Sequence, residues 1–487
     1  MESARRLVQA IVARGAPTRL WCVTHRAIAL PGETPQVNAA PLWGFARVVG
    51  LEHPAHWGGL IDLDDAVPAA TLAAQVLGGG AEDKVALRGE TRWGERLSRL
   101  TLPATTPAPH WSVSAGHGYL ITGGLGGVGL EIAGWLAARG ARHLLLLGRS
   151  APGELAHRTL AALRAQGVEI NVAAVDVADE TALARGLADW RVSGQPAIRG
   201  VVHAAGSWHD VPLAQLEAGA LASVLAPKVA GTWALERLLG ADLDFFVSCS
   251  SLSSVLPAHG QANYAAANAF LDAHAHWRQA QGRPALSVNW GPWSGVGFGA
   301  SERGRKAHER LESFGLRRIT PASALAALGE LLARGTTQAA VVAIDWSLLA
   351  RVDAPLARTM QLAEVAGHLV AETAALGVGG EWLHRLATTP AEARGDLVRG
   401  AVGEIVARVL RVNAAELRCA EPLSNLGLDS LMAVEIKNRF RADLGVDVPL
   451  ARFLEGASTD GLGEIVQAEF NAGGVKPAPP AEEEFVV

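Results

Sequence analysis

Residues 119–150 read YLITGGLGGVGLEIAGWLAARGARHLLLLGRS, which predicts a strand, a glycine-rich loop, a helix and a second strand. The apolar run Tyr119–Thr122 suits a buried parallel strand, and residues 128–139 carry helical periodicity. A second apolar run, His143–Leu147, returns after the helix. This order of elements predicts an α/β fold with a doubly wound parallel sheet, in which a ligand lies at the loop.

The loop contains five glycines, and its spacing satisfies both G-x-G-x-x-G and T-G-x-x-x-G-x-G. Glycine suits a turn that needs positive φ and lets a pyrophosphate approach backbone amides at a helix N-terminus. A purely structural turn is the alternative, but the strand before the loop and the helix after it favour dinucleotide binding. The predicted cofactor contacts in the loop are Thr122, Gly123, Gly124, Gly126, Gly127 and Gly129.

The end of the second strand indicates which dinucleotide binds. An NAD site places an acidic residue there to hold the ribose 2′-OH, whereas this chain has Gly148, Arg149 and Ser150. A guanidinium can bind a 2′-phosphate bidentately, and a carboxylate would repel it. Arg149 and Ser150 therefore predict NADPH, the alternative being that Arg149 is a solvated charge at the strand end.

Composition limits the class of protein. A chain of 487 residues is too long for one core, and its net charge of −5 gives no electrostatic case for a nucleic-acid partner. Cys22, Cys249 and Cys419 have no metal or disulfide spacing, so we expect no metal and a reducing cytoplasm. The N-terminal stretch lacks a signal-peptide pattern, and no uninterrupted apolar run approaches the roughly 18 residues of a membrane span, so we expect no membrane partner.

The sequence of residues 1–115 predicts a degenerate α/β unit with no glycine-rich phosphate loop and no catalytic cluster. We therefore expect this unit to have a structural role and to contribute no residue to the chemistry. It opens on a helix with no preceding strand, which favours a chain cut from a longer polypeptide. Its predicted helices are residues 4–14 and 42–49, its strands are 20–24, 59–63 and 84–87, and a proline-rich linker covers 101–116.

Residues 116–352 alternate apolar strands with helices, and we count seven strands: 119–122, 143–147, 170–175, 200–204, 243–248, 286–289 and 340–344. Ligands of such sheets lie at the carboxyl ends of the strands. The third and fourth strands therefore contribute cofactor contacts, with a packing role as the alternative. These predicted contacts are Asp176, Val177, His203, Ala204, Ala205 and Gly206.

The candidate reaction centre follows the fifth strand. Ser251 comes at that strand's end, Tyr264 follows thirteen residues later, and Asn268 shares a helix face with the tyrosine. Lys228 lies in the preceding helix. A phenol has an unperturbed pKa of about 10. The Lys228 ammonium and the nicotinamide charge are expected to lower it, so that Tyr264 exchanges protons with a carbonyl or alkoxide. The alternative is that Tyr264 is an ordinary amphipathic helix residue.

The C-terminal part predicts a small helical unit. We expect a linker over 353–395, a four-helix bundle over 396–471 and a disordered proline-rich, acidic tail over 472–487. The predicted helices include 396–412, 431–444 and 460–470. Ser430 precedes the second of these, so a phosphodiester attached there would meet a helix N-terminus. The alternative is that Ser430 is only an N-cap.

Several motifs together resemble a known family. TGGLGGVG at 122–129, HAAG at 203–206, Lys228, the serine pair 250–251 and GQANYAAANAFLD at 260–272 are similar to short-chain dehydrogenases/reductases, and specifically to the ketoreductase domain of modular polyketide synthases. GLDSL at 427–431 resembles the signature of acyl carrier proteins. The resemblance implies a catalytic Rossmann domain over 116–352, a cofactor-free pseudo-Rossmann half over 1–115 and an all-α carrier domain.

The resemblance also implies roles for residues. Tyr264 would be the proton donor and Ser251 would polarise the carbonyl, while Lys228 and Asn268 would orient the hydroxyl and a proton-relay water. Ser430 would carry 4′-phosphopantetheine. Many B-type ketoreductases have Leu-Asp-Asp where this chain has residues 208–210, Trp-His-Asp. The tryptophan of A-type enzymes is replaced by Leu256, so B-type stereochemistry is expected.

The expected function is NADPH-dependent reduction of a β-ketoacyl thioester to a β-hydroxyacyl thioester on a carrier. The expected partners are a phosphopantetheinyl transferase and other polyketide synthase domains. Two alternatives stay open: a carrier module whose ketoreductase is a non-catalytic scaffold, and a free-standing reductase of small ketones.

Overall fold

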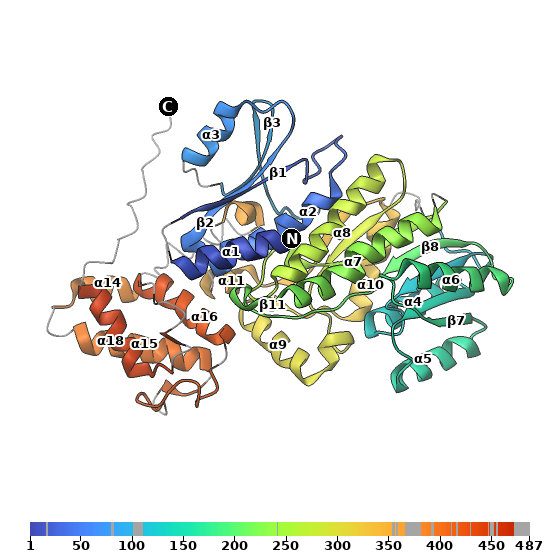
Figure 1. The fold of residues 1–487 in the computed structure, drawn as a ribbon. Coiled ribbons are helices and arrows are strands. Elements are labelled where there is room, and N and C mark those ends of the chain that lie inside the picture. Colours follow the sequence, from blue (N-terminus) through green and yellow to red (C-terminus); the bar gives the residue numbers. More distant parts are fainter. Residues whose placement is uncertain are drawn as a thin grey trace. The chain divides into compact units, whose positions relative to one another are not determined.

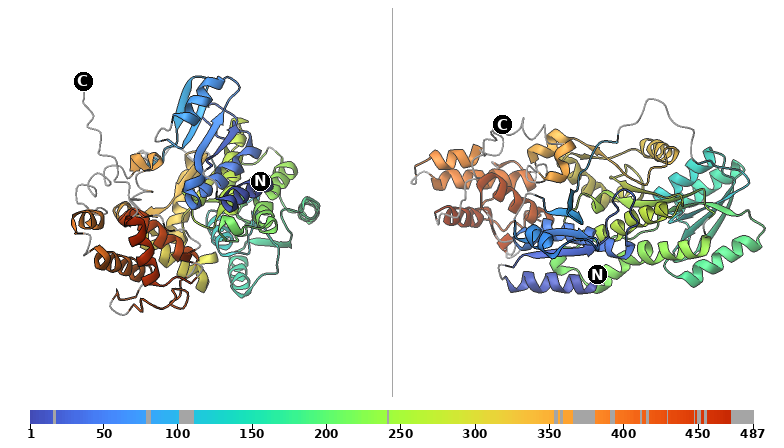
Figure 2. Two further views of the ribbon diagram at one scale, coloured as in Figure 1. Left: turned by 60° about the vertical axis from the view of Figure 1, so that its left-hand side comes forward. Right: turned by 90° about the horizontal axis from the view of Figure 1, so that it is seen from above.

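The computed structural model describes residues 1–471 apart from 16–17, 79–81, 101–110, 241, 353–355, 357–358, 366–380, 391–393, 411, 415–416, 429, 447, 449–451 and 454–455. The chain divides into two compact units, Met1–Asp345 and Trp346–Val487. Figure 1 and Figure 2 show the elements of each unit. The predicted tail, 472–487, lies outside the described residues.

The first part of unit one is a small four-stranded sheet in the order β1-β2-β3-β4. The first three strands are parallel, and β4 is antiparallel to β3. The bounds are β1 Leu20–His25, β2 Trp57–Leu63, β3 Lys84–Arg88 and β4 Thr91–Gly94, with helices α1 Glu2–Arg14, α2 Ala40–Glu52 and α3 Ala69–Leu77. The predicted helices and strands of this part are confirmed, whereas residues 101–110 of the predicted linker lie outside the described residues.

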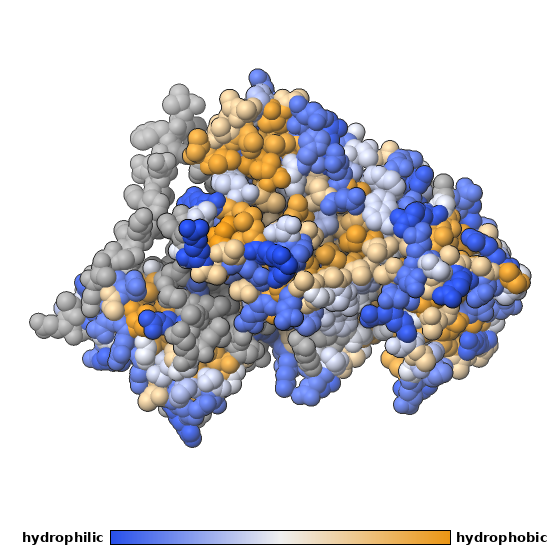
Figure 3. All heavy atoms as spheres, viewed as in Figure 1, coloured by the Kyte–Doolittle hydropathy of each residue, from blue (hydrophilic) through white to orange (hydrophobic). Residues whose placement is uncertain are grey.

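Two elements of this part of unit one, helix α3 and strand β4, were not predicted. The sequence of α3, AATLAAQVL, has almost no polar residues to set a helical period, and no described residue of α3 is buried. Leu77 at its end is 83 % exposed, and Figure 3 shows apolar side chains gathered around this helix. The four residues of β4 are all exposed, so they show no apolar alternation.

The second part of unit one is a seven-stranded parallel sheet in the order β12-β10-β9-β8-β5-β6-β7. Seven predicted strands are confirmed, but the last prediction, 340–344, was wrong in its extent. Only Gln338–Val341 (β12) joins this sheet, and Ala343–Ile344 (β13) pairs with Leu316–Arg317 (β11) instead. The other bounds are β5 Gly118–Thr122, β6 His143–Gly148, β7 Glu169–Ala174, β8 Ile198–His203, β9 Phe245–Ser251 and β10 Leu286–Trp290.

Helices cover both faces of this sheet, which explains why its strands are continuously apolar. Ile121 and Leu146 lie in one core cluster with residues of α4 (Gly127–Ala138), α5 (Glu154–Ala165) and α10 (Pro321–Ala333). Leu120 and Leu145, which alternate with them, lie in the opposite cluster with α6 (Glu180–Val192) and α7 (Ala218–Leu239). The strand order reverses between β5 and β8, and this switch point is where such sheets bind ligands.

Within the described residues, α7 alone is long and apolar enough to pass a membrane-span test of length and composition. Val224 and Leu235 of α7 are nevertheless buried in unit one, and the helix packs against α8 (Ala262–Ala280). Core packing accounts for its apolar composition.

The second unit is helical. Its helices include α11 Trp346–Val352, α14 Glu381–Thr388, α15 Arg394–Leu410, α16 Ser430–Arg439, which continues as a π-helical turn over Phe440–Leu444, and α18 Thr459–Asn471. The predicted linker, 353–395, is wrong at its C-terminal end. Leu386 of α14 is fully buried in the same cluster as Val402 and Phe440, so α14 belongs to the core of this helical unit.

Candidate active site

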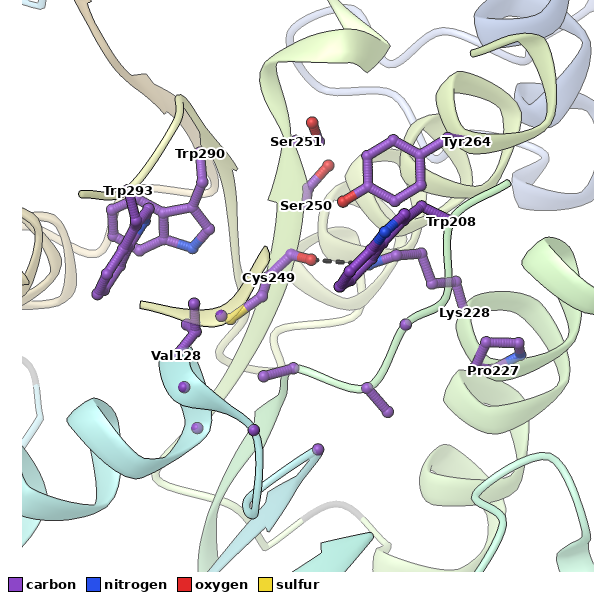
Figure 4. Close-up of a pocket in the computed structure, with 18 of the residues that line it drawn as sticks. Val128, Trp208, Pro227, Lys228, Cys249, Ser250, Ser251, Tyr264, Trp290 and Trp293 are labelled. Atoms are coloured by element: carbon purple, nitrogen blue, oxygen red, sulfur yellow. Dashed lines mark hydrogen bonds between the residues drawn. The ribbon is translucent and has the colours of Figure 1, made fainter. Parts of the chain in front are cut away.

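A cavity of about 670 Å³ opens at the carboxyl ends of the parallel strands of unit one (Figure 4). The residues lining it come from the strand ends and following loops on both sides of the switch point. The volume lies in the range typical of small-molecule and cofactor pockets. Among the described residues, no group of three or more His, Cys, Asp and Glu side chains is placed to hold a metal ion.

The glycine-rich loop forms one wall of the cavity. Gly123 has φ +66°, and a Cβ atom there would lie 2.8 Å from the backbone of Ala204. A Cβ atom on Gly129 would lie 2.3 Å from the Gly123 carbonyl oxygen. Gly126 is the N-cap of α4, so the first amides of that helix have no partner within it. This cradle of backbone amides at a helix N-terminus fits the pyrophosphate of a dinucleotide.

Most predicted cofactor residues line the cavity. They are Thr122, Gly123, Gly126, Gly127, Gly129, Arg149, Ser150, Asp176, Val177, Ala204, Ala205 and Gly206. Gly124 does not. A Cβ atom on Gly124 would lie 2.8 Å from the Ile121 oxygen and 3.0 Å from Leu146 Cβ, so this glycine lets the loop pack against β6.

His203 is the second predicted cofactor contact that does not line the cavity. Its ring is fully buried, with Nδ1 2.7 Å from Thr122 Oγ1 and Nε2 3.1 Å from the Pro227 oxygen. Burial, and then the Lys228 charge, lower its pKa to about 3. The Pro227 carbonyl can only accept, whereas the Thr122 hydroxyl can donate to the other ring nitrogen, so the proton of the neutral ring is assigned to Nε2. His203 therefore ties β5 to the helix turn that carries Lys228.

Lys228 lies on α7 directly after a proline. Pro227 frees the Ser223 carbonyl from the helix, and Ser207 Oγ donates to that carbonyl at 2.8 Å. Lys228 Nζ donates to the Cys249 carbonyl at 2.9 Å and lies 5.9 Å from the centre of the Tyr264 ring. Burial lowers the pKa of Lys228 to about 8.

Tyr264 lies in the first turn of α8, and its hydroxyl points toward the end of β9, where Ser250 and Ser251 lie (Figure 4). The prediction that its pKa is lowered is wrong for this structure. Burial raises the pKa, and hydrogen bonds with the Asn268 and Ser251 side chains only oppose that rise. The hydrogen bond of Lys228 Nζ is to the Cys249 carbonyl. The phenol is thus held protonated, which is the state that can donate a proton.

Asn268 is buried and does not line the cavity. Its amide nitrogen donates to the Tyr264 carbonyl at 2.8 Å, and its Oδ1 has no hydrogen-bond partner among the described residues. The structure therefore brings Lys228, Ser251 and Tyr264 together at one cavity and puts Asn268 directly behind the tyrosine.

Sequence reasoning missed a buried polar network that lies next to residues 251–254, at the end of β9. The Asp272 carboxylate accepts from Ser254 Oγ and Ser287 Oγ, both at 2.6 Å, and from Asn289 Nδ2. Ser254 Oγ in turn lies 3.0 Å from the Ser251 carbonyl oxygen. Burial raises the pKa of Asp272, and these donors oppose the rise. An acidic residue within the mostly buried helix α8 was the one sequence signal for this network.

The candidate carrier site lies in unit two. Ser430 is the first residue of α16, as predicted. The preceding loop turns at Gly427, with φ +90°, and Leu428 N donates to the Leu423 oxygen at 3.0 Å. Asp429 lies outside the described residues.

Comparisons with known proteins match three parts of the chain. Family models described as "Polyketide synthase extender module SpnB, Rossmann fold domain", "KR domain" and "Phosphopantetheine attachment site" match residues 1–97, 118–295 and 401–466. Polyketide synthase GfsB of Streptomyces halstedii is 36 % identical over 95 % of this chain. The pikromycin polyketide synthase component PikAIII of Streptomyces venezuelae is 35 % identical over 91 %. The chain spans only 9 % and 29 % of these relatives' lengths.

Solved structures are similar to about three quarters of the chain. A structure described as an A1-type ketoreductase has a TM-score of 0.71 at 36 % identity, covering 75 % of this chain and 78 % of that one. The first ketoreductase of the tylosin polyketide synthase has a TM-score of 0.66 at 37 % identity, covering 76 % and 79 %.

Proposed function

The chain belongs to the ketoreductase family of modular polyketide synthases, with a phosphopantetheine carrier domain after the reductase, and on that premise we propose that it reduces a β-ketoacyl thioester to a β-hydroxyacyl thioester. The observation that carries the proposal is that Lys228, Ser251 and Tyr264 line the same cavity as the glycine cradle. We propose NADPH as the reductant and Ser430-linked phosphopantetheine as the substrate's carrier. We also propose a cytoplasmic location, since the three cysteines are free thiols.

Each residue has a separate task in this reaction. NADPH, when bound, supplies the hydride that adds to the ketone carbon. The Ser251 hydroxyl donates a hydrogen bond to the carbonyl oxygen and fixes its direction. Tyr264 gives its proton to that same oxygen as negative charge develops there. The Lys228 ammonium, 5.9 Å from the ring centre, then stabilises the phenolate that Tyr264 becomes.

The two alternatives make different predictions. A non-catalytic scaffold would show no NADPH oxidation with any β-keto thioester, although the three residues that the chemistry needs are present. A free-standing reductase would act on small ketones as well as on thioesters, and it would have no use for a carrier domain. NADPH oxidation measured with a β-ketoacyl thioester of a small thiol, beside a simple ketone of equal size, separates the three functions.

Partners and stereochemistry are also proposals. The relatives are much longer than this chain, which supports other polyketide synthase domains as partners. A phosphopantetheinyl transferase would have to modify Ser430. Asp210 lines the cavity, and position 256 is Leu where A-type enzymes have Trp; both features favour the B-type product. Two similar structures are nevertheless described as A-type. Chiral analysis of the hydroxyacyl product decides this.

Arg149→Asp is expected to change the choice of dinucleotide. Arg149 lines the cavity at the end of β6, so the substitution replaces attraction for a 2′-phosphate with repulsion. The affinity for NADPH should fall more than about tenfold, or 1.4 kcal/mol, relative to that for NADH. Titration of both dinucleotides by fluorescence measures the ratio, and equal losses would mean that Arg149 does not contact the phosphate.

The rate of reduction is expected to fall as the pH rises through about 8, the value to which burial lowers the pKa of Lys228. Below that pH the ammonium is charged and can stabilise the phenolate, and above it the amine is neutral. The pH profile of kcat/KM should therefore have a descending limb there, and Lys228→Gln should be slower and lack this limb. A wild-type profile that stays level to pH 10 would contradict the assignment.

A further inference from the structure

The first part of unit one, residues 1–100, contributes none of its described residues to the cavity. Its helix α2 nevertheless packs directly on α8, the helix that carries Tyr264. A Cβ atom on Gly44 of α2 would lie 2.1 Å from the carbonyl oxygen of Ala265, so only glycine permits this approach. The contact lies one residue from the proposed proton donor.

Glu52, the last residue of α2, contacts two loops of the catalytic part. Its Oε2 accepts from the Leu213 amide at 2.6 Å, and its Oε1 accepts from the Gly260 amide at 2.6 Å. Burial raises the pKa of this carboxyl, and the two amides oppose the rise. One carboxylate thus joins two segments that are distant in the sequence.

Both segments lead into the cavity. Asp210, three residues before Leu213, lines it, and so does Gln261, directly after Gly260. The segments are also bonded to each other, since Val211 N donates to the Gly260 oxygen at 2.9 Å. Two side chains of the second segment reach the first, Asn263 Nδ2 to the His209 oxygen at 3.0 Å and Gln261 Nε2 to Asp210 Oδ2 at 3.3 Å.

Side chains of helix α1 donate hydrogen bonds to backbone carbonyls of the segment that contains Leu213. Gln9 Nε2 donates to the oxygens of Leu213 and Leu216, both at 2.9 Å, and Arg5 donates to the Leu216 oxygen at 2.7 Å. Leu213 is therefore held at its amide by α2 and at its carbonyl by α1. The residues before it include Trp208, which is half exposed and lines the same cavity as Tyr264 (Figure 4).

We propose that Glu52 is a positioning residue for the reduction: it fixes the 207–216 loop, with Trp208 and Asp210, relative to the Gly260–Tyr264 segment, and so sets the face of the ketone that is presented for reduction. The first part of unit one thereby acts on the stereochemistry without touching the substrate. This inference rests on the proposed reductase function.

The test is Glu52→Gln in the full chain. The amide that replaces one carboxylate oxygen is a donor facing a backbone N–H, so one of the two loops loses its acceptor. We expect kcat/KM for a β-ketoacyl thioester to fall by about tenfold or more, the size expected when a buried donor loses its partner. The two hydroxyl epimers should appear in a less unequal ratio, and amide hydrogen exchange should become faster in whichever of 207–216 and 258–263 loses its acceptor.

The matched control is Glu33→Gln. Glu33 belongs to the same part of the unit, and its carboxylate accepts from Arg88 Nε at 2.8 and 2.9 Å, away from both loops. This variant can lose stability, but it should keep the wild-type epimer ratio and the wild-type exchange rates in both loops. The epimer ratio is the informative quantity, because a smaller folded fraction lowers the rate without changing the epimer ratio.

Three outcomes would overturn the proposal. The first is a Glu52→Gln protein with the wild-type epimer ratio and exchange rates, and the second is an equal change in the Glu33→Gln control. If Glu52→Gln does not fold, Glu52→Asp takes its place, and its shorter carboxylate, which cannot reach both amides at once, should speed exchange in at least one of 207–216 and 258–263. Unchanged exchange in that variant is the third outcome. If the wild-type chain reduces no β-keto thioester, the proposed function fails, and the exchange rates alone decide whether Glu52 holds the loops.

Discussion

Tyr264→Phe is expected to leave NADPH binding intact and to slow reduction of a β-ketoacyl thioester by roughly 100-fold or more. The substitution keeps the ring that packs in the first turn of α8 and removes only the hydroxyl that points toward the end of β9. Because burial raises the pKa of this hydroxyl, it is protonated at neutral pH and available as an acid. NADPH oxidation under single-turnover conditions measures the loss.

Tyr119→Phe is the matched control, since Tyr119 is the only other tyrosine in the chain. Its hydroxyl contacts the backbone of Ser114, away from the cavity, so its loss should affect stability but not the chemical step. Ser251→Ala should slow reduction by less than Tyr264→Phe, because a hydrogen bond to the carbonyl is lost but the proton donor stays. Near-normal turnover in Tyr264→Phe would rule this residue out as the acid.

The seven-stranded sheet was predictable because its signal is local. Strands buried on both faces are apolar at every position, as Leu144 to Leu147 are, and this pattern needs no knowledge of the tertiary structure. Ser251 and the glycine-rich loop could also be predicted to lie close together, because each follows a parallel strand and the carboxyl ends of parallel strands share one edge of the sheet. The predicted edge and the cavity therefore coincide.

The features that sequence reasoning missed depend on tertiary contacts. Glu52 ends an unremarkable helix, and its two partners, Leu213 and Gly260, are backbone amides with no identity in the sequence. The direction of the Tyr264 pKa shift was wrong because the prediction weighed charges and could not see burial. His203 was assigned to the cofactor from its place at a strand end, but its ring turns into the sheet, toward Thr122 and Pro227.

Ser430→Ala is expected to abolish a modification that the intact chain accepts. Incubation with coenzyme A and a broad-specificity phosphopantetheinyl transferase should add one phosphopantetheine to the wild-type chain, as intact-protein mass spectrometry would show. Ser430 begins α16, so the attached phosphodiester would meet the amides and the positive end of that helix. The residues matched as a phosphopantetheine attachment site, 401–466, include it.

Ser458→Ala separates this role from helix capping. Ser458 also precedes a helix, α18, and its Oγ accepts from the Gly461 amide at 3.2 Å, which is an N-cap bond. Its loss should cost about 1 kcal/mol of stability, as for other N-caps, while the modification persists. If Ser430 were only a cap, both variants would behave alike. A phosphopantetheine still added to Ser430→Ala would move the attachment to another serine and remove the carrier argument.

The functional consequence can be tested on the modified chain. A thiol-tethered substrate is present at a high effective concentration, whereas a free thioester must reach that level in bulk solution. A β-ketoacyl group loaded on Ser430 should therefore be reduced by NADPH at protein concentrations where the free thioester reacts slowly. The same loaded chain with Tyr264→Phe should keep its ketone. A loaded wild-type chain whose ketone also persists would show that the two units do not act on one substrate, even if each is competent alone.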